Sequence, residues 1–258
     1  MTQSVVVQVG QCGNQVGCRF WDLALREHAH VNKKGLYDEA LSSFFRNAVL
    51  VDMEEGVVKE ILQGPLREVF DSAQLLTDVS GSGNNWAVGH MTYGSAYREQ
   101  IVDKLRKAAE HCDCLQCFFL IHSMGGGTGS GLGTSVLSLL EEEFPDVCRI
   151  VTSIYPSAED DVITSPYNSI LAMRELTEHA DCVLPVENQS LVDIVNKIKI
   201  MSHSAKPGSV IKRDSTVISG QGGLSGPEKP FDAMNNIVAN LLLNITSEPL
   251  CPLWKYPY

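Results

Sequence analysis

The sequence predicts an α/β fold in which a doubly wound, mainly parallel sheet carries helices on both faces. Short apolar segments alternate along the chain with longer amphipathic segments, as strands alternate with helices in such folds. Several of the apolar segments run directly into glycine-rich or acidic loops. Ligands of doubly wound sheets bind at the carboxyl ends of the strands, so these loops mark the expected binding site.

Composition excludes several classes of partner. The chain has 258 residues, 44% hydrophobic and 20% charged, as in ordinary globular proteins. Its net charge of −11 argues against nucleic acid and anionic membrane surfaces. Residues 1–9 lack the basic start of a signal peptide, and no apolar run approaches the roughly 20 residues of a membrane helix. We therefore expect a cytoplasmic or nuclear protein with no membrane partner.

The eight cysteines are expected to be reduced thiols, because disulfides are rare in the cytosol. Cys112, Cys114 and Cys117 form a CxCxxC pattern, with His111 and His122 nearby. A zinc site is an alternative for this cluster, but a second close pair of Cys or His residues is missing. Free thiols are the preferred interpretation.

The most informative stretch follows the apolar segment 117–121, which is typical of a buried strand. Ser123 and Met124 lead into the run GGGTGSG at residues 125–131, and an amphipathic helix is expected after it. A strand, a glycine loop and a helix together present backbone N–H groups and a positive helix end to an anion. Glycines are needed there because side chains would hold phosphates away from the backbone.

Two familiar phosphate-binding patterns do not fit this run. No lysine follows the glycines, as the P-loop requires, and no frame gives the dinucleotide pattern GxGxxG. An NAD-dependent oxidoreductase is therefore disfavoured, although it stays an alternative for this fold class. A flexible linker is also disfavoured, because a linker would not join a buried strand so tightly to an amphipathic helix.

The first expected strand, residues 5–9, passes through a glycine-bearing turn at residues 10–17 into a helix. The N-terminal end of this helix again faces an anion in such a unit. Gln11 and Cys12 lie at that end, close enough to contact phosphate oxygens.

Carboxylates follow the second expected strand, residues 48–51. Asp52 and Glu54 lie at its end, where they suit Mg2+ or its bound waters beside phosphates. A ribose contact is less consistent with the long gap from the first glycines. Solvent-exposed surface acids are the simpler alternative.

The remaining strands continue the pattern. Residues 75–79 are expected to end in the small-residue loop 80–86, whose N–H groups and Asn84 are placed to contact a terminal phosphate. Further strands are expected at residues 150–155 and 182–186.

Helix signals frame the last of these strands. Ser165 is an expected N-cap, with Pro166 in the first turn of a helix that reaches about residue 179. Asn188 opens the next helix, and residues 202–230 lack periodicity, which predicts a disordered loop.

Residues 231–247 recover a helix with one strongly apolar face that needs a partner. Met234, Ile237 and Leu241 belong to this face. No element is expected in the tail, residues 248–258, because it contains three prolines and no periodic pattern.

These motifs, in this order, resemble those of tubulins, and the likeness covers nearly the whole chain. Residues 231–241 and the acidic residues 159–161 look most like the epsilon branch of the tubulin family. Residues 84–86 and 113–116 disfavour the bacterial relatives. The matching motifs are residues 10–17, 80–86, 113–116, 125–131 and 166–168.

The resemblance implies a tubulin-type site that binds GTP, or GDP after turnover, together with Mg2+. Phe231 stands where most tubulins carry a tyrosine that stacks on the base, so stacking is expected to persist. The implied contacts are Gln11, Cys12, Gly83, Asn84, Ser123, Gly125, Gly126, Gly127, Thr128, Gly129, Ser130 and Gly131 for the phosphates; Glu54 and Asp52 for Mg2+; Asp161 for the ribose; and Asn188, Phe231 and Asn235 for guanine.

Three departures from the family pattern stand out. The connection at residues 46–49 is tighter than in the family, and the loop 202–230 is longer than in α- or β-tubulin. The sequence also stops soon after the helix at 231–247. We therefore interpret it as a shortened form that lacks the intermediate and C-terminal domains. It would have one GTP-binding domain over residues 1–247 and a divergent tail over residues 248–258.

The resemblance implies a GTP-binding cytoskeletal protein connected with microtubules, centrioles, basal bodies and the centrosome. Its implied partners are other tubulins or centriolar proteins. We expect weak or absent hydrolysis by this chain alone, because the sequence offers no activating residue and the family completes its site from a neighbouring subunit. The alternative is an interaction fragment with an incomplete nucleotide site and no polymerisation, in which exposed Met234, Ile237 and Leu241 attract chaperones.

Overall fold

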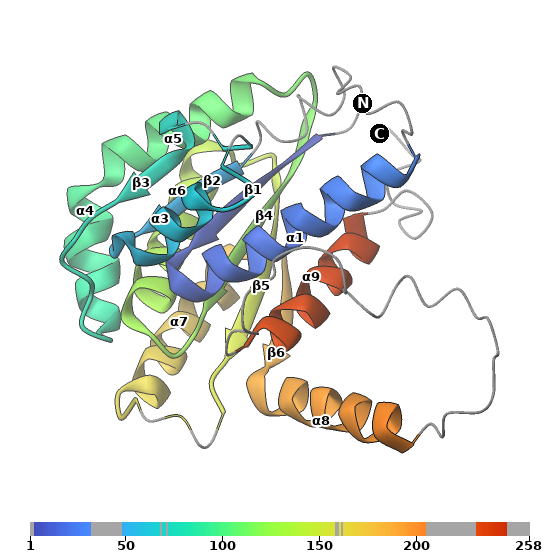
Figure 1. The fold of residues 1–258 in the computed structure, drawn as a ribbon. Coiled ribbons are helices and arrows are strands. Elements are labelled where there is room, and N and C mark those ends of the chain that lie inside the picture. Colours follow the sequence, from blue (N-terminus) through green and yellow to red (C-terminus); the bar gives the residue numbers. More distant parts are fainter. Residues whose placement is uncertain are drawn as a thin grey trace.

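A computed structural model of the protein describes residues 3–31, 48–67, 69–70, 72–157, 160, 162–204 and 231–246. A six-stranded sheet, parallel throughout, runs through the centre of the molecule in the order β3-β2-β1-β4-β5-β6 (Figure 1). This is the order of a doubly wound sheet and confirms the predicted fold class. The strands are β1 (Gln3–Val9), β2 (Ala48–Asp52), β3 (Leu75–Thr77), β4 (Leu115–Ser123), β5 (Cys148–Tyr155) and β6 (Cys182–Glu187).

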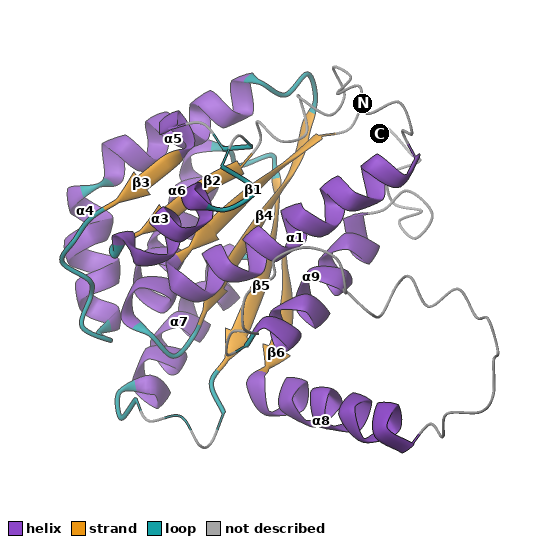
Figure 2. Cartoon of the chain, in the orientation of Figure 1, coloured by secondary structure: helices purple, strands orange, loops and turns teal. Residues whose placement is uncertain are grey.

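Helices cover both faces of the sheet (Figure 2). The helices are α1 (Gly10–Val31), α3 (Glu55–Gln63), α4 (Gly94–Ala96), α5 (Arg98–Glu110), α6 (Gly133–Glu143), α7 (Ser165–His179), α8 (Asn188–Ser204) and α9 (Asp232–Thr246). Alternate residues of each strand point to opposite faces, so Val5 and Val7 of β1 pack with α5 and α6, whereas Val6 packs with α1 and α9. Shorter helical turns are η1 (Ser72–Gln74) and the π-helical turns η2 (Val88–Tyr93) and η3 (Thr128–Leu132).

The strand order reverses between β1 and β4, which lie side by side at the centre of the sheet. Val7 pairs with Val49 of β2 on one side and with Leu120 of β4 on the other. The chain therefore winds outward in one direction after β1 and in the other after β4. The carboxyl ends of these two strands leave a crevice between their loops, which is where doubly wound sheets bind ligands.

The turn predicted at residues 10–17 is wrong, because α1 already begins at Gly10. Gly10 alone makes the turn, with φ at +75°, a conformation that favours glycine. Gly13 lies within the helix, where a Cβ would collide with the carbonyl oxygen of Ile121 in β4. Gly10 thus forms the turn, and Gly13 permits the close approach of α1 to the sheet.

The predicted start of α7 needs a smaller correction. The N-cap is Thr164, and Ser165 is the first helical residue, buried at 4% exposure. The Thr164 hydroxyl donates instead to the carbonyl of Asn84, at 2.7 Å, so this residue ties the helix to a loop. The sequence analysis did not predict α3 (Glu55–Gln63). This helix begins directly after Asp52 and Glu54, the acidic residues that follow β2.

The apolar face of α9 is largely covered, contrary to the expectation that Met234, Ile237 and Leu241 are exposed together. Met234 is 8% exposed and Ile237 is half-buried, whereas Leu241 is 42% exposed. The reason is that α9 lies beside α1 and packs its apolar residues into the same core (Figure 1). Only the Leu241 part of the prediction holds.

The expected loop at residues 202–230 begins later than predicted, since α8 continues to Ser204. Residues 205–230 and the tail at 248–258 lie outside the described residues. Within the described part, no cluster of three or more Cys, His, Asp or Glu side chains is arranged to hold a metal, so the zinc alternative gains no support. Cys112, Cys114 and Cys117 are free thiols. None of the described helices is long and apolar enough to cross a membrane.

Replacing Gly131 by alanine is expected to lower the free energy of unfolding by about 1–3 kcal/mol. A Cβ there would collide with the carbonyl oxygen of Trp86 and the amide nitrogen of His90, both rigid backbone atoms. Chemical denaturation measures the effect.

The matched control is Gly56→Ala in α3, where a Cβ meets nothing within 4 Å. This variant is expected to raise stability by up to about 1 kcal/mol, because alanine favours a helix over glycine. Equal effects of the two substitutions would contradict the packing account of Gly131.

Candidate functional site

A cavity of about 490 Å³ opens where the ends of β1 and β4 meet. This volume is in the range of sites for small molecules and cofactors, roughly 300–1,000 Å³. The cavity receives residues from the start of α1, the ends of β2 and β4, the loop after β3, and α8 and α9. The predicted contacts that line it are Gln11, Cys12, Asp52, Glu54, Gly83, Asn84, Ser123, Gly125, Gly126, Gly127, Thr128, Gly129, Asn188, Phe231 and Asn235.

Two backbone turns touch beside the cavity, which Gln11 and Gly129 line. A Cβ built on Gly10 would lie 3.1 Å from the backbone nitrogen of Gly129. The N-terminal end of α1 and the glycine run after β4 are therefore adjacent; the sequence predicted only that both lie at the carboxyl ends of strands. Helix N-termini and glycine loops both present N–H groups, so this arrangement suits an anion.

Only part of the glycine run faces the cavity. The run becomes helical at Thr128, and this turn rotates Ser130 and Gly131 into the interior. The Ser130 hydroxyl donates to the carbonyl of Gly126, and Gly131 packs against the backbone of Trp86 and His90. Ser130 and Gly131 thus do not line the cavity, in contrast to the expectation that both wrap a phosphate.

The loop after β3 is held against the glycine run. The hydroxyls of Ser82 and Thr128 are hydrogen-bonded at 2.8 Å. Asn84 adopts a left-handed backbone conformation with φ at 54°, and its side chain lies 3.7 Å from the Cβ position of Gly126. Sequence reasoning missed Ser82, since nothing in the sequence shows that these two loops meet.

Asp52 is buried at the end of β2, with 2% exposure. One carboxylate oxygen, Oδ1, accepts a hydrogen bond from the backbone N–H of Glu54 at 3.3 Å, and Oδ2 has no partner among the described residues. Burial raises the pKa of the Asp52 carboxyl to about 6. An unsatisfied, buried carboxylate oxygen beside a cavity fits a cation ligand.

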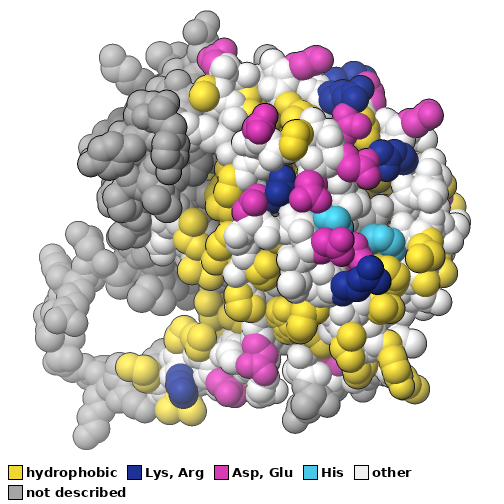
Figure 3. Space-filling model, turned by 180° about the vertical axis from the view of Figure 1, so that it is seen from behind, with side chains coloured by type: hydrophobic (Ala, Val, Ile, Leu, Met, Phe, Trp, Pro, Cys, Tyr) yellow, Lys and Arg dark blue, Asp and Glu magenta, His cyan; other side chains and the backbone are white. Residues whose placement is uncertain are grey.

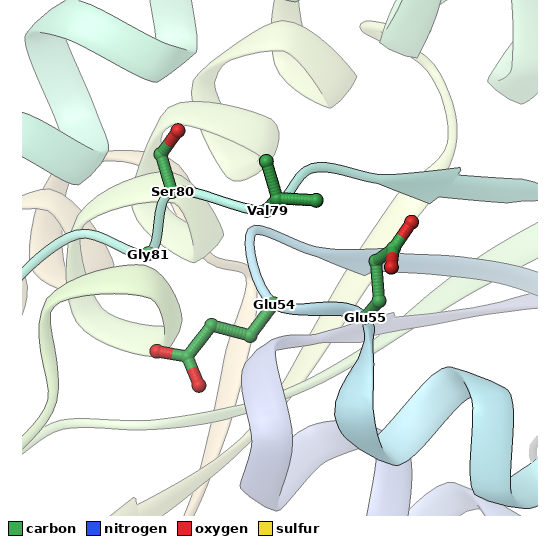
Figure 4. Close-up of a pocket in the computed structure, with 5 residues that line it drawn as sticks. All are labelled: Glu54, Glu55, Val79, Ser80 and Gly81. Atoms are coloured by element: carbon green, nitrogen blue, oxygen red, sulfur yellow. The ribbon is translucent and has the colours of Figure 1, made fainter.

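Glu54 is exposed and lies between two hollows. It lines the main cavity and also a smaller pocket of about 260 Å³ with Glu55, Val79, Ser80 and Gly81 (Figure 4). The two glutamate side chains point in different directions from neighbouring positions in the chain: Glu54 extends toward Gly81, whereas Glu55 points away from it (Figure 4). Of these two glutamates, only Glu54 lines the main cavity.

The charged side chains that line the cavity are acidic. Asp52, Glu54 and Asp160 contribute carboxylates, and no Lys or Arg is present among the described lining residues. A polyphosphate in this cavity would therefore depend on backbone N–H groups, helix ends and a bound cation for its neutralisation. Asp161, the expected ribose contact, lies outside the described residues, although Asp160 and Val162 on either side line the cavity.

The far end of the cavity is less polar. Leu191, Met234 and Val238 from α8 and α9 contribute apolar surface there. Asn188 begins α8, and Phe231 precedes α9 with φ at 74° and 58% exposure. Apolar walls with a few amide groups are what a flat heterocyclic base requires.

Two further residues of the site escaped the sequence reasoning. The buried Ser165 hydroxyl lines the cavity and has no partner among the described residues. The Asn14 side chain donates to the carbonyls of Gly10 and Val51, at 3.0 and 3.1 Å, and so joins the first turn of α1 to the end of β2. Cys12, which was predicted, is a neutral thiol here, since burial raises its pKa to about 12.

Fold and cavity together define a doubly wound α/β domain whose glycine run, at the edge of the cavity, follows neither the P-loop nor the dinucleotide pattern. The chain belongs to the Tubulin/FtsZ family, whose GTPase domain matches residues 3–196. It is 69% identical to the human tubulin epsilon chain and 67% identical to the tubulin epsilon chain of Mus musculus, in each case over 96% of this chain. The chain spans 57% of the length of each of these relatives.

Replacing Asp52 by asparagine is expected to stabilise the protein at pH 7.5, without Mg2+ or nucleotide, by about 2–3 kcal/mol. The folded-state pKa of about 6 lies above the ordinary value of 3.8, so ionisation of Asp52 opposes folding as the pH rises through this interval. The difference in stability between the two proteins should vanish below about pH 4. Chemical denaturation at several pH values measures it.

Asp193→Asn on the exposed surface of α8 is the matched control and is expected to change stability by less than about 0.5 kcal/mol. Equal stability of the parent and Asp52→Asn at pH 7.5 would contradict the prediction. It would show that other interactions offset the cost of burying the Asp52 carboxylate.

Proposed function

We propose that the protein binds GTP, with Mg2+, in the cavity between the ends of β1 and β4. The observation that carries the proposal is the contact of the Gly10 turn with the glycine run at Gly129, in a chain of the Tubulin/FtsZ family. Both turns offer N–H groups to one anion. The apolar wall formed with α8 and α9 supplies a place for the base, with Asn188 and Asn235 as candidate guanine contacts and Phe231 as a stacking ring.

The proposed role of Mg2+ follows from the charges of the cavity wall. The described wall offers three carboxylates, those of Asp52, Glu54 and Asp160, and no basic side chain to a polyphosphate. When bound, Mg2+ would supply the positive charge that this wall lacks. Glu54 is the candidate ligand with the freer side chain, and the unsatisfied Oδ2 of Asp52 is a second candidate beside it.

Hydrolysis by this chain alone is proposed to be slow. Phosphoryl transfer depends on a positioned water and on charges that stabilise the transition state. No described lining residue is an arginine or lysine, and we assign no activating residue in the cavity. Turnover by the isolated chain at the rate of a complete tubulin polymer would refute this part of the proposal.

The cellular role is proposed from the relatives. The human and mouse proteins are tubulin epsilon chains, so we propose a place in the microtubule cytoskeleton, at centrioles and the centrosome, with other tubulins or centriolar proteins as partners. Because the chain spans 57% of these relatives, their complete activity is not assumed for it.

A second candidate function is an interaction fragment whose nucleotide site is incomplete. Apolar side chains gather over the lower part of the surface in Figure 3, and the most exposed ones on α7 and α8 are Tyr167, Ile170, Ile200 and Met201, each at least 65% exposed. Such a surface favours contact with other proteins, chaperones included. Equilibrium dialysis of the folded protein against GTP separates the two candidates, since absence of uptake favours the fragment.

Replacing Gly126 by alanine is expected to weaken GTP binding at least about tenfold without lowering stability. A Cβ at this position meets only the Asn84 amide oxygen at 3.7 Å and the Ser123 hydroxyl at 4.0 Å, so the fold has room for it. Both neighbours line the cavity, where the methyl group would occupy space proposed for a phosphate. Titration calorimetry and thermal unfolding give the two quantities.

The control for this variant is Gly56→Ala, which adds the same methyl group in open space away from the cavity. It should leave the dissociation constant for GTP unchanged. If Gly126→Ala binds GTP as tightly as the parent, the phosphates do not lie against the glycine run.

Replacing Glu54 by glutamine is expected to reduce the dependence of GTP binding on Mg2+. The parent protein should lose about tenfold in affinity for GTP when Mg2+ is chelated, whereas the variant should lose much less, because it has one ligand fewer for the ion. Glu55→Gln is the matched control, since Glu55 does not line the main cavity. An unchanged Mg2+ dependence in Glu54→Gln would exclude Glu54 as a ligand.

A further inference from the structure

Asn168, in the first turns of α7, makes hydrogen bonds to two loops that are far from it in the sequence. Its Nδ2 group donates to the carbonyls of Asn84, at 2.9 Å, and Gly125, at 2.8 Å. Its Oδ1 atom accepts from the backbone N–H of Trp86 at 2.9 Å. Asn168 is buried, with 3% exposure, and both N–H groups of its carboxamide and its oxygen have hydrogen-bond partners.

The partners belong to separate elements. Asn84 and Trp86 lie in the loop after β3, more than 80 residues before Asn168, whereas Gly125 follows β4. One side chain therefore joins the loop after β3, the start of the glycine run and α7. Buried hydrogen bonds of this kind fix loops because an unmade bond would leave a buried polar group unsatisfied.

Thr164 reinforces one of these connections. Its hydroxyl donates to the same carbonyl of Asn84 at 2.7 Å. This oxygen therefore accepts two hydrogen bonds, one from Asn168 in α7 and one from the N-cap residue, Thr164. Asn84 has a positive φ of 54°, a conformation that residues other than glycine adopt infrequently. The two bonds hold Asn84 in this conformation and thereby set where its side chain lies in the cavity.

We propose that Asn168 is a positioning residue that locks the loop after β3 to the glycine run, and so sets the discrimination between GTP and GDP. The inference rests on the proposed GTP site, in which Gly83 and Asn84 are the candidate contacts of the terminal phosphate. Asn168 is not itself among the lining residues and acts through the two loops. Groups that are fixed in advance bind a phosphate without the cost of ordering them.

The first test compares Asn168→Ala with Asn240→Ala, which removes a carboxamide of α9 that donates to the carbonyl of Asn236 in the same helix. The dissociation constants for GTP and GDP are measured in the presence of Mg2+. Asn168→Ala should weaken GTP about tenfold more than GDP, because GDP lacks the phosphate that the two loops would enclose. The control variant should keep the parent's ratio. An equal loss for both nucleotides, or no loss, would overturn the proposal.

The second test needs no nucleotide and separates failure of the lock from failure of the GTP site. Hydrogen exchange in Asn168→Ala should accelerate together in residues 80–87 and 123–127, and stay unchanged in α5. Unchanged exchange in the two loops, or faster exchange throughout the protein, would contradict the proposal that Asn168 holds these loops together, even if GTP binds. If the parent protein binds no guanine nucleotide, the proposed function is wrong, and so is the claim of nucleotide discrimination. The exchange result would still show whether Asn168 holds the two loops together.

Thr164→Val provides the same readouts if Asn168→Ala does not fold. Thr164 is exposed, and valine has nearly the same shape without the donor to Asn84. The expected shift in the ratio of GTP to GDP affinity has the same direction and a smaller size, about threefold, because one bond to the Asn84 carbonyl is kept. A ratio equal to that of the parent would count against the proposal.

Discussion

The site depends on one constraint, the pairing of β1 with β4 as neighbours at the point where the strand order reverses. This pairing brings the Gly10 turn against Gly129, so the start of α1 and the glycine run meet at one crevice. Gly13 lets α1 approach β4 closely enough for the contact, since any side chain there would strike the carbonyl oxygen of Ile121. The positive end of α1 thus reaches the same crevice as the glycine run.

Electrostatics then determine what the crevice can hold. The described wall combines backbone donors with carboxylates and lacks a basic side chain, so the proposed polyphosphate would need a divalent cation to offset its charge. Burial of Asp52 without a second partner for its carboxylate opposes folding at neutral pH. The proposed Mg2+ would offset this cost when bound, and ion binding would then raise the stability of the domain.

Local sequence patterns predict the fold class and much of the candidate site. The remaining site residues depend on contacts between segments that are far apart in the sequence. Glycines directly after apolar segments marked the Gly10 turn and residues 125–129, because backbone approach demands small residues wherever it occurs. Ser130 and Gly131 have the same residue types, yet the helical rotation after Thr128 turns them into the core. Asn168 appeared only as part of a family motif, since its role arises from loops brought to it by the fold.

The most direct test of the account is to purify the protein without added nucleotide, denature it and identify the released small molecules by chromatography. The account predicts stoichiometric GTP or GDP, because the cavity is formed by described residues and is the proposed site of a guanine nucleotide with Mg2+. A folded protein that releases no nucleotide and takes up none when GTP and Mg2+ are added would contradict it. The interaction-fragment interpretation would then hold.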